Sequence, residues 1–334
     1  MPVYFRPIVC ADAKRPADAV SLHGGPLWFN QVEPLERGIS HALMPASDMP
    51  FEHLQTLSEP HVLAGLPKDR AAIMGVLNVT PDSFSDGGKY SAPQAAAAHA
   101  QVMLEAGADI LDIGGESTRP GAAFVPEAEE ITRTAPVIAA LREAGVTAPI
   151  SIDTRKAAVA QAALAAGGTM LNDVSAMTYD AEMPNVARDS TAPICLMHAQ
   201  GDPKTMQDSP QYDNVLLDVF DHLAARVAAA QKAGIPKERI IVDPGIGFGK
   251  TQAHNLTLIR NLSLFHTLGC QILLGVSRKR FIGNIGGAPQ AEDRASGSVA
   301  VALKGLMQGV QIIRAHDIDA HRQAFALWRA LHTS

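Results

Sequence analysis

Four acids and amides end or follow short apolar runs in this sequence, and they are the first indication of chemistry. They are Asn78, Asp153, Asn172 and Asp243. If the runs are parallel strands, their carboxyl ends meet on one face of the sheet, where these side chains can converge. A single acid at a strand end is often only a helix cap, so the argument depends on all four. Together they predict a wall that accepts hydrogen bonds from an amine-rich ligand.

The last two apolar runs lead into cations. Arg314 and His316 lie two residues apart, as do Ser277 and Lys279, so each pair faces one side of its strand if the strands extend that far. Two cations on one interior strand are costly to bury without an anion. In many barrels, the region after the last two strands binds a phosphate. We therefore predict an anion pocket opposite the acids, and a phosphorylated, amine-rich heterocycle as the ligand.

Other conspicuous residues indicate structure more than chemistry. The segment Gly247-Phe248-Gly249-Lys250 lacks the spacing of a nucleotide-binding phosphate loop. Glu116 is explained equally well as a brace for its own loop, and His198 as a structural residue. His254 and His266 are expected at the surface or in packing.

The elements that must position the polar residues are eight short apolar runs, which alternate with helical segments from about residue 71 onward. Apolar runs without a polar alternation indicate parallel strands that are covered on both faces. Most of the helical segments end at a glycine, as helices often do. This order favours a closed (β/α)₈ barrel, the TIM barrel of the α/β class, over a doubly wound open sheet. The predicted strands are Ile73–Val79, Ile110–Gly114, Pro149–Asp153, Met170–Val174, Pro193–Met197, Ile240–Asp243, Ile272–Ser277 and Gln311–Ala315. The predicted helices are Ala95–Ala106, Pro126–Ala144, Lys156–Ala166, Asp218–Ala233, Asn255–Leu268, Ser298–Gln308 and Ala320–Leu331.

Residues 1–70 differ from the rest, because they contain several prolines and few periodic apolar runs. We expect an N-terminal extension there, with one short β-hairpin around Gly24-Gly25 that covers the bottom of the barrel. Residues 71–334 are expected to form the barrel itself.

Composition excludes several classes of partner. The net charge is −6 and the pI is about 6.0, which favours binding neither to nucleic acid nor to an anionic membrane. Cys10, Cys195 and Cys270 fit no disulfide framework and no zinc pattern, so we expect reduced thiols. The first residues do not resemble a secretory signal, and no stretch approaches the roughly 18 uninterrupted apolar residues of a membrane span. We expect a soluble, cytoplasmic protein.

Several motifs together resemble the dihydropteroate synthase family, over about residues 71–331. They are GVLNVTPDSFSDGG (75–88), ILDIGGESTRPGA (110–122), SIDT (151–154), LNDV (171–174), LMHAQGDPKTMQ (196–207), VDPGIGFGK (242–250), GVSRKRFIG (275–283) and IIRAHD (312–317). The resemblance implies an enzyme of tetrahydrofolate biosynthesis and a sulfonamide target. The reaction it implies joins (7,8-dihydropterin-6-yl)methyl diphosphate to 4-aminobenzoate and gives 7,8-dihydropteroate and diphosphate. The C–O bond would break first and leave a pterin methylene cation, with diphosphate as a good leaving group on Mg²⁺ and cations.

The resemblance also implies roles for individual residues. Asn172 and Asp243 correspond to the groups that bind the amino and ring-nitrogen edge of the pterin. Asp153 corresponds to an aspartate beside the ring, and Lys279 to a lysine between the pterin and the substrate amine. Asp153, Lys279 and Asp243 are therefore the expected catalytic residues.

The remaining implied roles concern the second substrate and the leaving group. Asn78, Arg314 and His316 would bind the diphosphate, with Asn78 as the Mg²⁺ contact. The loops after the first two strands would close over the cation and exclude water. The family resemblance further implies a homodimer. The residues expected around 4-aminobenzoate are Thr118, Arg119, Pro120, Phe84, Phe248 and Ser277.

Two other functions fit the same barrel. A pterin-dependent methyltransferase would share the pterin-binding acids, but it would need a cobalamin partner and has no use for a diphosphate pocket. A non-catalytic pterin-binding protein would be expected to lose the loop motifs, and both are complete here. The sequence departs from the family pattern at Arg280 and Ala199, neither of which has an implied role.

Overall fold

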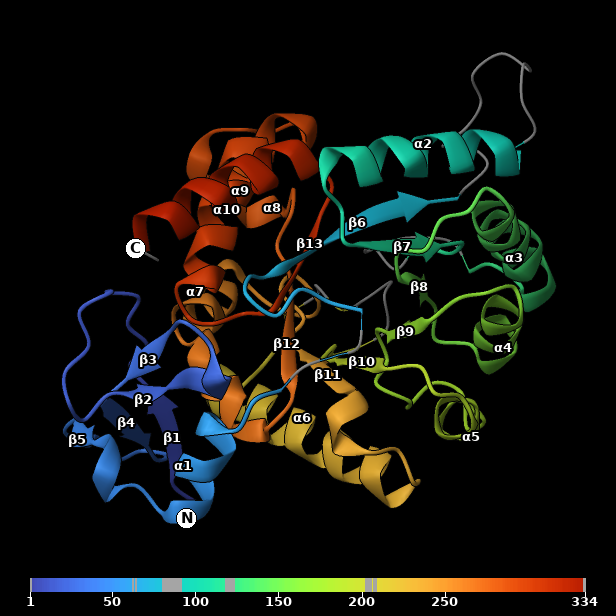
Figure 1. Cartoon of the computed structure of the whole chain (residues 1–334). Helices are drawn as coiled ribbons and strands as arrows, with labels where there is room; N and C mark the ends of the chain where they lie inside the picture. Colours follow the sequence, from blue (N-terminus) through green and yellow to red (C-terminus); the bar gives the residue numbers. More distant parts are fainter. Residues whose placement is uncertain are drawn as a thin grey trace.

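The computed structural model describes residues 2–332 except 62, 64, 80–91, 118–123, 202–205, 207 and 208, and only the backbone of Ala92. Eight parallel strands close into a barrel in chain order, because the last strand pairs with the first (Figure 1). The predicted TIM barrel is confirmed, and the open sheet is excluded. The strands are β6 (Ala72–Asn78), β7 (Ile110–Gly114), β8 (Ile150–Asp153), β9 (Met170–Asp173), β10 (Ile194–Met197), β11 (Ile240–Asp243), β12 (Gln271–Gly275) and β13 (Ile312–Ala315).

The barrel interior is closed at the end where the strands begin. Met74, Met170, Cys195 and other inward side chains form one apolar cluster, and Leu63, from the segment before β6, joins it. A larger apolar cluster fills the space between the strands and the surrounding helices. The amino end of the barrel is therefore closed by apolar side chains. Polar groups at the carboxyl ends of the strands meet at the opposite, open end.

The helices surround the strands, and most lie where the sequence predicts them. Two short helices, α5 and α8, were not predicted. The predicted helix Asn255–Leu268 is in fact two elements, because α7 ends at Arg260 and a 3₁₀ turn, η5 (Leu262–Leu268), follows. The helices are α2 (Ala92–Ala106), α3 (Glu127–Glu143), α4 (Ala157–Ala165), α5 (Met183–Asp189), α6 (Val215–Lys232), α7 (Gln252–Arg260), α8 (Arg280–Gly286), α9 (Ala295–Leu306) and α10 (Ile318–His332).

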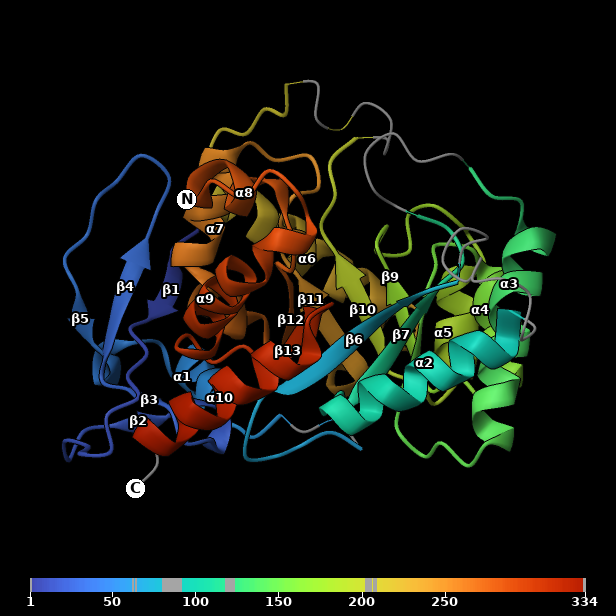
Figure 2. The same ribbon diagram turned by 90° about the horizontal axis from the view of Figure 1, so that it is seen from above.

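Residues 2–60 form small elements on one side of the barrel, as Figures 1 and 2 both show. The strands β2 and β3 pair as an antiparallel hairpin around the Gly24-Gly25 turn. The other strands form an antiparallel sheet in the order β1-β4-β5. The elements are β1 (Tyr4–Pro7), β2 (Val20–Ser21), η1 (Leu22–Gly24), β3 (Trp28–Phe29), β4 (Gln31–Leu35), β5 (Met44–Pro45), η2 (Ala46–Asp48) and α1 (Phe51–Ser58).

This N-terminal part has its own apolar cluster, which includes Phe29, Val32 and Leu57. It is attached to the flank of the barrel by polar contacts. The Tyr4 hydroxyl donates to Asp221 on α6 at 2.8 Å, and Ser263 Oγ in η5 donates to the carbonyl of Pro7 at 2.8 Å. The three-stranded sheet therefore packs beside α6 and η5, while the segment that contains Leu63 adjoins the bottom of the barrel.

Two expectations about the whole chain can be compared with the structure. Cys10, Cys195 and Cys270 all carry free thiols. Across the described residues, the helices are too short or too polar to span a lipid bilayer.

Candidate active site

A cavity of about 890 Å³ opens at the carboxyl ends of the strands. It is lined by residues from the ends of β6, β8, β9, β11, β12 and β13, and from the turns that follow them. Every described residue to which the sequence assigns a site role lies on its wall. They are Asn78, Asp153, Asn172, Asp243, Phe248, Ser277, Lys279, Arg314 and His316. The other predicted residues, Phe84, Thr118, Arg119 and Pro120, lie outside the described residues.

At the centre of the mouth, Arg314 on β13 forms ion pairs with two acids from across the barrel. Its Nε lies 2.6 Å from Asp112 Oδ2, and its Nη2 lies 2.8 Å from Asp153 Oδ2. We call Asp112, Asp153 and Arg314 the mouth cluster. The sequence predicts Arg314 on a wall opposite the acids; the structure instead pairs it with them. The sequence analysis did not predict a role for Asp112, which is fully buried within the apolar run of β7.

The two acids of the mouth cluster keep unused hydrogen-bonding capacity. Within the described part of the chain, Asp112 Oδ1 and Asp153 Oδ1 have no hydrogen-bond partner. Buried polar atoms are seldom left unsatisfied, so the unpartnered oxygen of Asp153, which lines the cavity, indicates a ligand that supplies donors. Asp112 is fully buried and does not itself line the cavity. Burial raises the pKa of Asp153 to about 7, although the positive charge of Arg314 opposes the shift. The carboxyl group of Asp153 can therefore change its charge near neutral pH.

Neighbouring residues at the end of β9 have different surroundings. Asn172 Nδ2 donates to Asp112 Oδ2 at 3.2 Å, which joins this amide to the mouth cluster. The carboxylate of Asp173 instead accepts from the backbone N–H groups of Ser175 and Met177, at 2.8 and 2.7 Å. Asp173 thus stabilises the turn after β9, and Asn172 lines the cavity.

The turn after β11 contacts a predicted acid and a predicted cation. The N–H of Gly245 donates to Asp243 Oδ1 at 2.7 Å. Burial raises the pKa of Asp243 to about 6, and this hydrogen bond opposes the shift. The ring of Phe248 lies beneath Lys279, with Nζ 4.2 Å from the ring centroid. This distance allows a cation–π interaction.

The turns after β12 and β13 contact each other. Ser277 Oγ accepts from the backbone N–H of His316 at 3.1 Å and lies 3.0 Å from Nδ1 of the same residue. Arg278 has a positive φ of 59° and pairs through its guanidinium with Asp317. The predicted strand Ile272–Ser277 therefore ends earlier, at Gly275, because the chain turns sharply at Arg278. Ser277 and Lys279 both reach the cavity from this turn.

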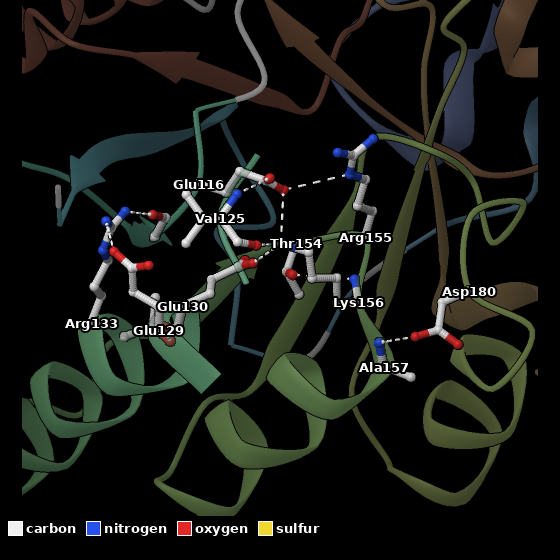
Figure 3. A network of polar contacts seen from close by, with 12 residues as sticks. Glu116, Val125, Glu129, Glu130, Arg133, Thr154, Arg155, Lys156, Ala157 and Asp180 are labelled. Atoms are coloured by element: carbon white, nitrogen blue, oxygen red, sulfur yellow. Dashed lines mark hydrogen bonds and ion pairs between the residues drawn. The ribbon is translucent and has the colours of Figure 1, made fainter. Parts of the chain in front are cut away.

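A second charged cluster lies at the rim of the mouth, between β7, α3 and the start of α4 (Figure 3). Lys156 Nζ donates to Glu116 Oε2 at 3.1 Å, to Glu130 Oε2 at 2.6 Å and to the carbonyl of Val125 at 2.6 Å. Glu116 Oε1 accepts from the backbone N–H of Val125 at 3.0 Å. We call Glu116, Glu130 and Lys156 the rim cluster. Glu116 does brace its own surroundings, as the sequence suggests, but its partner Lys156 was not predicted.

The histidines outside the site have structural partners. His198 is buried, and burial with the nearby positive charge of Lys250 lowers its pKa to about 2, so its ring is neutral. His254 lies in the first turn of α7, where its N–H donates to Thr251 Oγ1 at 3.2 Å. His266 is buried in η5, with Nε2 2.8 Å from the carbonyl of Gln308.

No group of three or more His, Cys, Asp and Glu side chains among the described residues could bind a metal ion by itself. The exposed Asn78 lies on the cavity wall, and its side chain has one amide oxygen that could bind a cation. Mg²⁺ often has only one or two protein ligands and takes its other oxygens from water and substrate phosphates. The residues present therefore fit a Mg²⁺ ion that arrives with a phosphate-containing substrate.

Comparisons with known proteins point to one family. The profile of the family described as "Pterin binding enzyme" matches residues 74–316. The dihydropteroate synthase of Neisseria meningitidis serogroup B is 49% identical over 268 residues, which cover 79% of this chain and 93% of that protein. The Xanthomonas albilineans dihydropteroate synthase with 4-aminobenzoic acid is 45% identical, with a TM-score of 0.75, and covers 80% of this chain and 94% of its own. The same enzyme in complex with 7,8-dihydropteroate is 42% identical, with a TM-score of 0.73, and covers 80% and 96%.

Proposed function

We propose a division of catalytic labour among the residues of this chain, from the premise that the chain belongs to the dihydropteroate synthase family of pterin-binding enzymes. Its activity is that of the family: it transfers the (7,8-dihydropterin-6-yl)methyl group from its diphosphate to the amine of 4-aminobenzoate and releases diphosphate. One observation carries the assignment of residues. The nine described residues with predicted roles line one cavity, although they are scattered between positions 78 and 316 of the sequence.

Asp243 and Asn172 are proposed to bind the amino and ring-nitrogen edge of the pterin. Both are nearly fully buried on the cavity wall, and carboxylates form strong hydrogen bonds with adjacent N–H donors in such surroundings. We add Asp112 to the residues that support the pterin. Its Oδ1 has no partner among the described residues, and its Oδ2 holds both Asn172 and Arg314.

Asp153 is proposed to stabilise the pterin methylene cation that forms when the C–O bond breaks. Its carboxylate lies at the centre of the mouth, where water is partly excluded and fixed charges act strongly on a developing charge. Binding of a cationic intermediate would favour the ionised form of Asp153. Lys279, which lies on the Phe248 ring, is proposed to orient the amine of 4-aminobenzoate toward this cation.

Arg314 and His316 are proposed to bind the diphosphate. Two nitrogens of the Arg314 guanidinium contact acids, and the described residues give no partner to the third, Nη1, which therefore remains available to an anion. Asn78 is proposed as the protein ligand of Mg²⁺. When bound, this ion would supply positive charge that stabilises the departing diphosphate.

The binding site of 4-aminobenzoate is proposed around Phe248 and Ser277, which line the cavity next to Lys279. Thr118, Arg119, Pro120 and Phe84 belong to this proposal through the family resemblance alone. We also propose a cytoplasmic homodimer in which residues 1–70 are an extension of the barrel domain, residues 71–334. Leu327 and Leu331, which are 62% and 80% exposed on α10, support an apolar contact surface on the outside of the barrel.

The test is an assay of the purified chain with (7,8-dihydropterin-6-yl)methyl diphosphate, 4-aminobenzoate and Mg²⁺, without any corrinoid. We expect equal amounts of 7,8-dihydropteroate and diphosphate. Omission of 4-aminobenzoate should abolish formation of dihydropteroate. Absence of dihydropteroate in the complete mixture, from folded protein, would contradict the proposal.

A further inference from the structure

The loop between β11 and α7, residues 244–251, contacts two predicted site residues at once. Its Gly245 N–H donates to Asp243 Oδ1 at 2.7 Å. Its Phe248 ring supports Lys279 Nζ at 4.2 Å. The backbone conformation of this loop therefore decides where one carboxylate and one ammonium group of the mouth are located.

This conformation requires glycine, because the loop is pressed against the end of β10. Gly245, Gly247 and Gly249 have φ values of +67°, +86° and +61°. A Cβ atom on Gly245 would lie 1.8 Å from the carbonyl oxygen of His198, and one on Gly249 would lie 2.4 Å from that of Gln200. Three glycines in one short loop also allow many other conformations, so the observed one needs a restraint.

Lys250 supplies that restraint. Its Nζ lies within hydrogen-bonding distance of the carbonyls of Gly245, Phe248 and His198, at 2.9, 2.9 and 3.3 Å, and 2.9 Å from His198 Nδ1. One ammonium group thus joins both halves of the loop to the end of β10. The residue is only 3% exposed.

The surroundings of Lys250 are not those of a residue that serves stability. The ion pairs of the described residues include none between Lys250 and a carboxylate. An ammonium group buried without a carboxylate in ion-pair contact loses hydration free energy, which the carbonyl dipoles and the more distant charge of Asp243 only partly restore. Burial accordingly lowers the pKa of Lys250 to about 7. What the lysine provides is three N–H donors, shared among three carbonyls and the Nδ1 atom of His198.

We propose that Lys250 is a positioning residue: by joining the carbonyls of His198, Gly245 and Phe248, it fixes the β11–α7 loop and thereby aligns Asp243 and Lys279 for the reaction. The proposal rests on the proposed function, which places the pterin at Asp243 and the amine at Lys279. Lys250 borders the cavity, but it is not a catalytic residue in this proposal, because the hydrogen bonds of its ammonium group go to the loop and to His198.

The experiment compares Lys250→Met with the unmodified enzyme. Methionine keeps an unbranched side chain that is only one heavy atom shorter, but it offers no donor. We expect a folded protein in which kcat/KM falls roughly 10- to 100-fold, because small displacements of catalytic groups have effects of this size. The KM for 4-aminobenzoate should rise, and the affinity for 6-hydroxymethyl-7,8-dihydropterin, measured by calorimetry, should fall. A purely structural role would lower the fraction of active protein and the melting temperature but leave both constants unchanged.

A double-mutant cycle with Phe248→Leu distinguishes action through the loop from a separate effect. If Lys250 acts through the position of Phe248, the loss caused by Lys250→Met should be smaller in the Phe248→Leu background. Strictly additive losses would overturn the proposal, as would unchanged KM and pterin affinity.

Two further cases complete the test. Lys250→Gln keeps two N–H donors in a neutral side chain, and it replaces Lys250→Met if the latter does not fold; the same shifts are expected with smaller size. Failure of both variants to fold would assign Lys250 to stability and overturn the proposal. If the unmodified chain makes no dihydropteroate, the proposed function fails, whereas the pterin affinity still tests the effect of Lys250 on Asp243.

Discussion

The mouth cluster and the rim cluster lie at the same end of the barrel, and the turn after β8 contributes one residue to each. They differ in exposure and in how many of their polar atoms have partners. Asp153 belongs to the mouth cluster, and Lys156, three residues later, belongs to the rim cluster. In the mouth cluster, each acid has one oxygen without a partner among the described residues, and the Arg314 side chain is 24% exposed. In the rim cluster, Lys156 is 1% exposed and has two carboxylates and a carbonyl as partners. Only Glu116 of that cluster reaches the cavity wall.

The comparison shows that burial and residue type alone do not identify a functional charge. Both clusters contain two acids and one cation. What differs is whether unused hydrogen-bonding capacity faces a space that a ligand can enter. Glu130 in the rim cluster also has an oxygen without a described partner, but Glu130, like Asp112, is fully buried and does not line the cavity, whereas Asp153 and Arg314 do. We therefore expect changes in the rim cluster to affect stability and changes in the mouth cluster to affect activity.

The largest expected effect is that of Lys156→Met, which leaves Glu116 and Glu130 buried without their shared cation. Breaking a buried ion pair by removing one partner typically costs about 3–5 kcal/mol. The free energy of unfolding, measured with urea, should fall by an amount of this order, while kcat of the folded fraction should change much less. Lys232→Met, at an exposed position near the end of α6, is the matched control and should change stability by less than about 0.5 kcal/mol. Unchanged stability of Lys156→Met would show that the rim cluster is not a structural element.

Asp153→Asn is the corresponding change in the mouth cluster and should have the opposite profile. The variant keeps the size of the side chain but cannot supply negative charge to the cation. We expect kcat to fall roughly 10²- to 10³-fold, as for removal of one stabilising group from other active sites. The protein should remain folded and still bind the pterin. Unchanged turnover would remove Asp153 from the mechanism and would erase the distinction between the two clusters.

Arg314→Ala should have a smaller but more selective effect. Hydrogen bonds to charged groups contribute about 1.5–3 kcal/mol, so the diphosphate substrate should bind roughly 10- to 100-fold more weakly. Affinity for 6-hydroxymethyl-7,8-dihydropterin, which lacks the diphosphate, should fall much less. Arg314→Lys keeps the charge without the planar fork and controls for the two acids left unpaired in the alanine variant. Equal weakening of both ligands would contradict a diphosphate site at Arg314.

The sequence predicted one of the two clusters much better than the other. Asp153, Asn172 and Asp243 were recognised because each ends an apolar run, and in a parallel barrel such ends meet on one face. Asp112 was missed because it lies inside the run of β7, and its partner Arg314 is 202 positions away. An acid within an otherwise apolar strand is costly to bury alone, and this was the available signal. Lys156 gave no comparable signal, because it lies at the start of a predicted helix, where a lysine is ordinarily exposed.

The fold shows the same limit on a larger scale. The eight strands were predicted because buried parallel strands are recognisable as apolar runs. Helix α5 was missed because it has seven residues, including Pro184 and Asn185, and little helical periodicity. The end of β12 was placed too late because the turn that follows the strand depends on distant contacts. Arg278, which has a positive φ in this turn, contacts Asp317 and Ser298.

The last prediction concerns pH, and it compares one acid from each cluster. Burial raises the pKa of both Asp153 and Glu130 in the folded protein. Between about pH 4 and 7, the folded state keeps the proton of Asp153 while the unfolded state loses it. Stability from this residue is therefore present at low pH and lost as pH rises through that window. One proton changes the free energy of unfolding by at most about 1.4 kcal/mol per pH unit.

Buried histidines oppose this trend in the same window, because burial lowers the pKa of His198 to about 2 and that of His266 to about 4. We therefore compare the free energy of unfolding of each variant with that of the unmodified protein at each pH. The contributions of titrating groups that both proteins share cancel in this difference. For both Asp153→Asn and Glu130→Gln, this difference should move in favour of the variant as pH rises. Saturating 6-hydroxymethyl-7,8-dihydropterin should alter the curve for Asp153→Asn, because the ligand occupies the mouth, and leave that for Glu130→Gln unchanged. A ligand effect of equal size on both curves would mean that the mouth cluster and the rim cluster titrate as one unit, which would contradict their separation.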